Sequence, residues 1–264
     1  ALLGPDCNLK YQTTNGYDII YKKVVLTLDK IEVFKQMVQN AKRIVFFGGA
    51  GVSTESGIPD FRSEDGLYHL KYPYPPEEIL SHHFFMEHTK EFYHFYKEKV
   101  LWLDVKPNIT HFKLAQWEEE GKLSCIVTQN IDGLHQLAGS KRVLELHGSI
   151  YRNYCMKCGT FYDVHTIKDS YGIPICSCGG MIKPDVVLYE EALDEMVIKQ
   201  SISQIQQADL LIVGGTSLAV YPAASFIQYF CGERLVMINR SATSLDIKAD
   251  LVLQENLGDI FSQI

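Results

Sequence analysis

Four short apolar runs, each followed at once by glycine or a polar residue, constrain the fold of this chain most. They occupy residues 44–47, 123–127, 210–213 and 235–238. Strands buried on both faces of a parallel sheet read as continuous apolar runs, and open α/β sheets bind ligands at the carboxyl ends of such strands. The runs therefore predict an α/β protein with a Rossmann-like parallel sheet flanked by helices, and a ligand site where the runs end.

Two segments between these runs differ from them in character. Residues 65–105 are rich in aromatic residues and histidine and predict helices packed outside the sheet, whereas residues 151–183 carry four clustered cysteines. We expect them to form an inserted small domain made of a helical module and a zinc-binding module. The large domain would then comprise residues 28–64, 106–150 and 184–264, preceded by an N-terminal extension of unknown role at residues 1–27.

Composition and charge exclude several classes of protein. Of the 264 residues, 46% are hydrophobic and 22% are charged, which is typical of a folded globular chain. The net charge is −7, whereas a protein that binds nucleic acid over a wide face usually has an excess of basic residues. No apolar run approaches the ~20 residues of a membrane helix, and residues 1–10 do not resemble a signal peptide. We therefore expect a cytoplasmic protein that binds neither nucleic acid nor membranes. We also expect a monomer, although composition does not decide this.

The clustered cysteines predict a metal site. Cys155-x-x-Cys158 and Cys176-x-Cys178 resemble the paired C-x₂-C motifs of zinc proteins, with one spacer residue lost in the second pair. Glycine follows each pair, as tight chelating turns require. Four thiolates fill every position of a tetrahedral zinc ion, so we expect this zinc to hold the small domain together and to do no chemistry.

The turn after the first apolar run is a weak dinucleotide signal. Gly49-Ala50-Gly51 lets a backbone approach a phosphate, but Thr54 stands where the third glycine of G-x-G-x-x-G would fall. A tight turn from strand to helix, opening a helix at Val52, explains the glycines equally well. The following segment, SGIPDFRSEDGLY, is too rich in glycine, proline and charge for a regular element, which disfavours a dehydrogenase and suggests a lid over a nucleotide.

Polar residues at the ends of later runs are candidates for binding and catalysis. Gln129, Asn130 and Asp132 could hold ribose hydroxyls or an amide ligand, although capping of the next helix would also explain them. His147 follows an apolar run and precedes a glycine, which makes it the best placed of the nine histidines to act as a base. A histidine satisfied by packing is the alternative.

Together the motifs resemble a known family. GAGVSTESGIPDFRSEDGLY, TQNIDGLHQLAG, LHGSI, the cysteine quartet, GTSLAVYPAA and INR follow the order and spacing of the bacterial-type sirtuins over residues 28–264. The resemblance implies an NAD-dependent protein lysine deacylase that removes acetyl or apolar acyl groups and produces nicotinamide and O-acyl-ADP-ribose. It implies NAD as cosubstrate, one structural zinc ion, and acyl-lysine proteins or peptides as partners.

The same resemblance implies roles for individual residues. His147, as general base, and Asn130 would be catalytic. The NAD site would comprise Gly49, Ala50, Gly51, Thr54, Phe61, Arg62, Gln129, Asn130, Ile131, Asp132, His147, Gly215, Thr216, Ser217, Asn239 and Asp259. The substrate peptide would bind Val187, Leu188 and Tyr189. The metal ligands would be Cys155, Cys158, Cys176 and Cys178.

Two departures from the family pattern bear on the substrate. Sirtuins that prefer succinyl or malonyl lysine carry tyrosine and arginine three residues apart, whereas this chain has Tyr93 and Tyr96. A phenol cannot give a carboxylate the charged bidentate pair that arginine gives, so we expect acetyl or apolar acyl groups. Glu190 replaces the glycine of the V-x-F-G-E segment, which we expect to restrict the backbone and to favour peptides with basic flanks.

Two other functions remain open at this point. A protein ADP-ribosyltransferase or an NAD hydrolase could use the same fold, and it would release nicotinamide without acyl-lysine. A non-enzymatic NAD-binding module is the second alternative, against which the intact His147, Asn130 and Asp132 argue.

Overall fold

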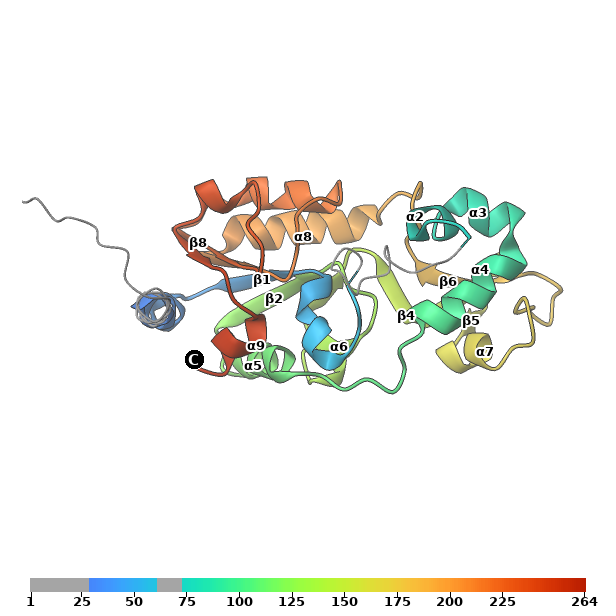
Figure 1. Ribbon diagram of the computed structural model, residues 1–264, viewed down its shortest axis with the longest axis horizontal. Coiled ribbons are helices and arrows are strands. Elements are labelled where there is room, and N and C mark those ends of the chain that lie inside the picture. Colours follow the sequence, from blue (N-terminus) through green and yellow to red (C-terminus); the bar gives the residue numbers. More distant parts are fainter. Residues whose placement is uncertain (1–28, 61–72) are drawn as a thin grey trace, which may run out of the picture.

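The computed structural model describes residues 29–60 and 73–264. Its centre is a parallel sheet of six strands in the order β3-β2-β1-β7-β8-β9 (Figure 1). The strands are β1 (Ile44–Gly48), β2 (Leu123–Thr128), β3 (Val143–Glu145), β7 (Leu210–Gly214), β8 (Arg234–Ile238) and β9 (Leu251–Leu253). The predicted Rossmann-like sheet is thus confirmed, and β3 and β9 extend it at its two edges.

The order of the strands places a binding crevice at the centre of the sheet. From β1 the chain builds outward to β2 and β3, and then returns to add β7, β8 and β9 on the other side. Such a reversal leaves a crevice outside the carboxyl ends of the two central strands, where α/β proteins bind nucleotides.

Each face of the sheet packs against its own layer of helices. Phe46 packs against the helix of residues 29–40, α5 (Ile109–Glu119) and α9 (Leu257–Phe261). Phe47, the next residue, packs on the other face against α8 (Glu195–Gln207) and η5 (Ala223–Tyr229). The two layers lie on opposite sides of the sheet in Figure 1. Because successive strand residues point to opposite faces, continuous apolar strands supply both cores.

A second, smaller unit lies at the other end of the molecule (Figure 1). Its antiparallel sheet has the order β5-β4-β6. The elements are β4 (Gly148–Cys155), β5 (Phe161–Tyr162), β6 (Ile182–Val186), α2 (Pro76–Ile79), α3 (His82–Glu87), α4 (Thr89–Phe95), the π-helical turn η4 (Tyr96–Val100) and α7 (Val164–Lys168). One apolar cluster, built around Phe85, Phe92 and Ile182, joins the helices to this sheet.

The arrangement of the small unit agrees with the predicted helical and zinc-binding modules. Lys97 connects the two, because its Nζ donates to the carbonyl and the hydroxyl of Ser170 and to the Gly172 carbonyl at 2.6–3.0 Å. The exact domain boundaries given above stay predictions. Strands β4 and β6 run across two of them, at residues 150 and 183.

The segment after β1 is not the regular helix that the sequence suggested. Two 3₁₀ turns, η1 (Ala50–Val52) and η2 (Thr54–Ser56), take its place. Elsewhere in the chain, α6 (Leu134–Leu137) follows β2 and the 3₁₀ turn η6 (Asp246–Lys248) follows β8. Gly57 has a left-handed backbone (φ +93°) and Pro59 follows, so no helix can continue. The predicted lid residues Phe61 and Arg62 lie outside the described residues. Within residues 29–60 and 73–264, no helix is long and apolar enough to cross a membrane.

Candidate active site

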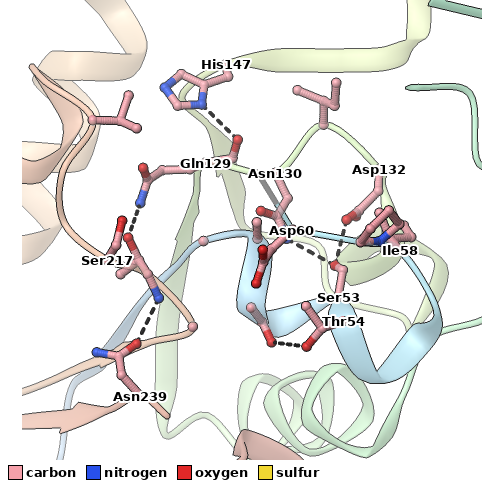
Figure 2. Close-up of a pocket in the computed structure, with 18 of the residues that line it drawn as sticks. Ser53, Thr54, Ile58, Asp60, Gln129, Asn130, Asp132, His147, Ser217 and Asn239 are labelled. Atoms are coloured by element: carbon pink, nitrogen blue, oxygen red, sulfur yellow. Dashed lines mark hydrogen bonds between the residues drawn. The ribbon is translucent and has the colours of Figure 1, made fainter. Parts of the chain in front are cut away.

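A pocket of about 520 Å³ opens at the carboxyl ends of β1, β2, β7 and β8 (Figure 2). One part of its lining comes from the loops that follow these strands, and another part comes from the small unit through Leu80, Tyr96 and residues 186–191. The pocket therefore lies where the two units meet, with the polar strand ends on one side and apolar side chains on the other.

Two glycines bring the loops after β1 and β7 into backbone contact. Gly51 N donates to Gly215 O at 2.8 Å. A Cβ atom added at Gly51 would lie 2.8 Å from the Gly215 Cα, and one at Gly215, where φ is +62°, would lie 2.5 Å from Val52 N. Neither position can carry a larger side chain without a backbone shift. Both glycines are therefore required for the close contact between the loops after β1 and β7.

A buried hydrogen-bond network joins Ser53, Asn130 and Asp132 (Figure 2). Ser53 Oγ donates to Asp132 Oδ2 at 2.6 Å and accepts from Asn130 Nδ2 at 3.0 Å. Asp132 Oδ1 also accepts from Leu134 N at 2.9 Å, so capping of α6 is one of its functions, as the alternative interpretation held. Burial raises the pKa of Asp132, and the hydrogen bonds that its carboxylate accepts oppose that rise.

His147 lies between β3 and β4, and its imidazole ring makes one hydrogen bond within the described part of the chain. Its Nδ1 lies 2.8 Å from the Gln129 carbonyl oxygen (Figure 2). A carbonyl only accepts, so Nδ1 carries the hydrogen and Nε2 keeps its lone pair. Burial lowers the pKa of His147, and the bond to the Gln129 carbonyl partly offsets this effect. The imidazole is therefore neutral near pH 7, as a general base must be.

The residue after this histidine can only be glycine. Gly148 has φ +77°, and a Cβ atom there would lie 1.9 Å from the Asp185 carbonyl oxygen. Because glycine has no Cβ atom, β4 and β6 can approach each other at this point. Val187 N donates to His147 O at 3.0 Å just beyond it. The predicted substrate segment is thereby placed directly beside the candidate base.

A second chain of hydrogen bonds extends along the other half of the pocket (Figure 2). Gln129 Nε2 donates to Thr216 Oγ1 at 3.1 Å, and Thr216 N donates to Asn239 Oδ1 at 2.8 Å. These contacts join the ends of β2, β7 and β8 across the sheet. Of the predicted NAD-site residues, all those that the structure describes line the pocket except Asp259.

Asp259 lies on the exposed side of α9, where its carboxylate accepts from Asn256 Nδ2 at 2.9 Å. Leu257 and Ile260 on the same helix are buried against the sheet, which turns residue 259 away from it. Residues 255–257 line the pocket instead. The predicted role of Asp259 near the adenine stays a prediction, without support from this geometry.

The predicted substrate segment follows β6 and runs beside α2 and α3 of the same small unit. Tyr189 N donates to Leu80 O at 3.0 Å, and Tyr189 O accepts from His82 N at 2.9 Å. Glu190 has a left-handed backbone (φ 75°), a conformation that glycine adopts at no cost. Its carboxylate accepts from His83 N at 2.9 Å in the first turn of α3, which offsets part of the strain.

The four predicted metal ligands converge at one point. The Sγ atoms of Cys155, Cys158, Cys176 and Cys178 all lie within 4.8 Å of one another. Cys155 and Cys178 are 3.4 Å apart and Cys158 and Cys176 are 3.6 Å apart, close to the ~3.8 Å that tetrahedral Zn–S bonds of ~2.3 Å require. Backbone N–H groups of Lys157 and Cys178 each point at a thiol sulfur at 3.4 Å. The donor set fits a structural zinc ion.

Some pocket residues carried no signal that singled them out in the sequence. Ser53 is 1% exposed and connects the loop after β1 to the loop after β2, but in the sequence it is one serine in a polar turn. The loop of residues 240–243 also lines the pocket, and nothing but its place after a predicted strand end could have indicated this. Tyr96 stands out in the sequence only because it occupies a position where some sirtuins have arginine.

The fold and the site define a Rossmann-like nucleotide-binding protein whose pocket is completed by an inserted four-cysteine module. Comparison with known proteins specifies the class further, because residues 49–222 match the model of the Sir2 family. A Clostridium acetobutylicum protein named NAD-dependent protein deacetylase is 59% identical over 91% of this chain and 100% of its own length. A Clostridium perfringens protein of the same name is 56% identical over 89% and 98%.

A solved structure agrees with these relatives. A Sir2 with a deacetylated p53 peptide and 3′-O-acetyl ADP ribose superposes with a TM-score of 0.83 at 38% identity, covering 89% of this chain and 96% of the other. This chain belongs to the Sir2 family. The family resemblance proposed from the sequence motifs is confirmed.

Proposed function

We propose that this chain removes acetyl groups from lysine side chains of proteins, with NAD as cosubstrate, and that His147 is its general base. The enzyme is an NAD-dependent protein deacetylase, the name that its relatives at 59% and 56% identity carry over nearly their whole length. The observation that carries the role of His147 is its bond to the Gln129 carbonyl, which directs the lone pair of Nε2 away from the backbone.

The base has a specific task in this reaction. NAD, when bound, supplies the electrophilic ribose carbon and the nicotinamide that leaves it. Nε2 of His147 accepts a proton from a ribose hydroxyl, so that this oxygen can attack the acyl carbon. The lowered pKa of His147 keeps Nε2 unprotonated at neutral pH, so kcat/KM falls on the acid side with a pKa below the ordinary 6.5.

The Ser53, Asn130 and Asp132 network serves the nicotinamide half. The buried Asp132 carboxylate accepts from an amide N–H, and Asn130 orients a ribose hydroxyl. Both are held in place by Ser53 before any ligand binds, so little ordering is needed on binding. The remaining parts of NAD are held by the other residues predicted for this site that line the pocket, namely Gly49–Gly51, Thr54, Gly215–Ser217 and Asn239.

Residues 187–189 hold the acyl-lysine peptide as an added strand, because this segment already runs beside Leu80 and His147 in extended pairing. Apolar side chains of Ile131, Val186 and Leu188 line the path of the acyl-lysine and exclude water. The zinc held by the four cysteines fixes this half of the site and takes no part in the chemistry. We propose the predicted two-domain boundaries, a monomer, and a cytoplasmic location for the working enzyme.

The test measures nicotinamide release from NAD with and without an acetyl-lysine peptide. We expect release that requires the peptide, and a loss of at least ~100-fold in His147→Ala. His94→Ala, which removes an exposed histidine from α4, is the matched control and keeps full activity. Release without peptide would instead indicate an NAD hydrolase or ADP-ribosyltransferase, and no release at all would indicate a binding module.

A further inference from the structure

The side chain of Asn108 binds the segment that forms one wall of the pocket, although Asn108 is not part of the lining. Its Nδ2 donates to Val52 O at 2.8 Å and to Ser56 Oγ at 2.9 Å. Between these two points lie Ser53 and Thr54, which line the pocket (Figure 2). Both N–H groups of one amide therefore hold the ends of a short span that faces the ligand.

This span, residues 52–56, has little internal support of its own. It belongs to the 3₁₀ turns η1 and η2, and such turns have poorer hydrogen-bond geometry than an α-helix. Ser53 Oγ, the atom that joins Asn130 to Asp132, lies within it. A shift of the span would therefore move Ser53 and disturb the network that is proposed to bind the nicotinamide half of NAD.

Asn108 is itself fixed by helix α5, of which it is the N-cap. Its Oδ1 accepts from Thr110 N at 3.0 Å, and its backbone N donates to His111 Nδ1 at 3.2 Å. Burial lowers the pKa of His111 to about 4, so the ring is neutral and Nδ1 can accept. The helix packs through Leu114 and Trp117 into the apolar core of the sheet. The amide is thus held by a rigid element.

The partners of this amide determine which way it points. A backbone N–H only donates and a carbonyl oxygen only accepts, so Oδ1 faces Thr110 N and Nδ2 faces Val52 O. The oxygen therefore serves the helix, and the nitrogen serves the loop. Because different atoms carry the two functions, a substitution can remove one and keep the other.

We propose that Asn108 is a positioning residue for NAD binding, whose Nδ2 holds the loop after β1 in the conformation that binds the cosubstrate. Asn108 acts through Val52 and Ser56 and does not touch NAD. The inference rests on the proposed function for the identity of the ligand, and it adds a residue outside the pocket to those predicted to bind NAD.

The experiment replaces the nitrogen and keeps the cap. Asparagine, aspartate and serine cap helices about equally well, so Asn108→Asp and Asn108→Ser both retain an oxygen for α5, but neither retains the Nδ2 donor. The dissociation constant of NAD is measured by calorimetry without peptide. The KM of an acetyl-lysine peptide and the melting temperature are measured alongside.

We expect NAD to bind about tenfold more weakly to both variants. Two neutral hydrogen bonds correspond together to up to about 25-fold, and water replaces part of this when the amide is lost. The peptide KM should stay within about twofold, and the melting temperature should fall by only a few degrees, because the cap remains. Asn108→Ser places no carboxylate beside Val52 O, so it decides the question if Asn108→Asp does not fold.

Asp194→Ala is the matched control, since Asp194 is the N-cap of α8 in the same unit. Its Oδ1 accepts from Met196 N at 2.8 Å and from Val197 N at 2.9 Å. Loss of this cap should lower the melting temperature and leave NAD binding unchanged. Hydrogen exchange gives a second measurement: residues 49–58 should exchange faster in Asn108→Ser, while α5 stays protected.

Three results would overturn the inference. They are unchanged NAD binding in both Asn108 variants, an equal loss of NAD binding in Asp194→Ala, or loss of protection throughout α5 in Asn108→Ser. A wild-type protein that binds NAD but does not deacetylate the peptide would contradict the proposed function alone, because NAD binding still decides the role of Asn108. A wild-type protein that binds no NAD would contradict both.

Discussion

The two units of this enzyme are stabilised by different means. The parallel sheet is enclosed by two apolar cores, one on each face, and Phe46 and Phe47 are both completely buried in them. The small unit has one core and a short three-stranded sheet, and four thiols converge at its end. We therefore expect the large unit to depend on burial of apolar surface, and the small unit to depend in addition on the metal ion that the four thiols would hold.

Removing the metal should have the largest effect, and it should destabilise the small unit while the large unit stays folded. Structural zinc contributes ~10–16 kcal/mol to small metal-dependent folds, so chelation or Cys176→Ser should unfold the small unit locally. Hydrogen exchange should then show loss of protection in β4 and β6, while β1 and β7 stay protected. Ser177→Ala, at the adjacent residue that is not a ligand, is the control. Folded, active protein with no bound zinc would contradict the comparison.

Phe46→Ala tests the large unit in the same way. Truncating a fully buried phenylalanine costs about 3–5 kcal/mol, through lost burial and the cavity that remains. We expect denaturant unfolding of the sheet to shift by this amount while the zinc content stays at one per chain. A variant that instead lost its zinc would show that the two units do not unfold separately.

A pH titration of stability sharpens the contrast further. His111 and His135 are buried between α5 and α6 of the large unit with ring centroids 4.8 Å apart, and burial lowers the pKa of His111 to about 4 and that of His135 well below 6.5. A neutral buried imidazole contributes stability above the unfolded pKa of ~6.5, and this contribution is lost as the pH falls toward the folded pKa.

His135→Leu should therefore flatten the loss of stability between pH 6.5 and 4, at little cost at pH 7, because neither ring nitrogen of His135 has a partner among the described residues. Urea unfolding at several pH values measures the slope. Acid also releases zinc from thiolates, so both proteins are compared with equal metal content. Equal slopes in the two proteins would exclude His135 as the source.

Glu190→Gly, at the junction of the two units, should have the smallest effect. Glycine relieves a left-handed backbone strain of ~1–2 kcal/mol but loses the bond to His83 N, worth about 1 kcal/mol. We expect the melting temperature to change by only a few degrees, and the preference for basic residues beside the acyl-lysine to weaken. Peptide-array scanning measures the second effect, and an unchanged preference would remove Glu190 from peptide recognition.

Much of the fold followed from local patterns. The apolar runs gave β1, β2, β7 and β8 to within a residue or so, because a strand buried on both faces has a continuous apolar sequence. Strands β3 and β9 were not separately predicted, since each has only three residues. The helix expected at Val52 became two 3₁₀ turns, because Gly57 and Pro59 follow too closely for a full helix.

In the candidate site, too, some features follow from local sequence and others only from tertiary packing. By itself the sequence determined the cysteine quartet, the glycine turn and the place of His147, because metal ligands, tight turns and strand ends impose residue types at fixed spacings along the chain. Only the tertiary structure decided that Nδ1 of His147 binds the Gln129 carbonyl, that Ser53 joins Asn130 to Asp132, and that Asp259 faces away from the sheet. A hydrogen-bond partner is selected by packing between segments far apart in the chain, and no local pattern of residues encodes that selection.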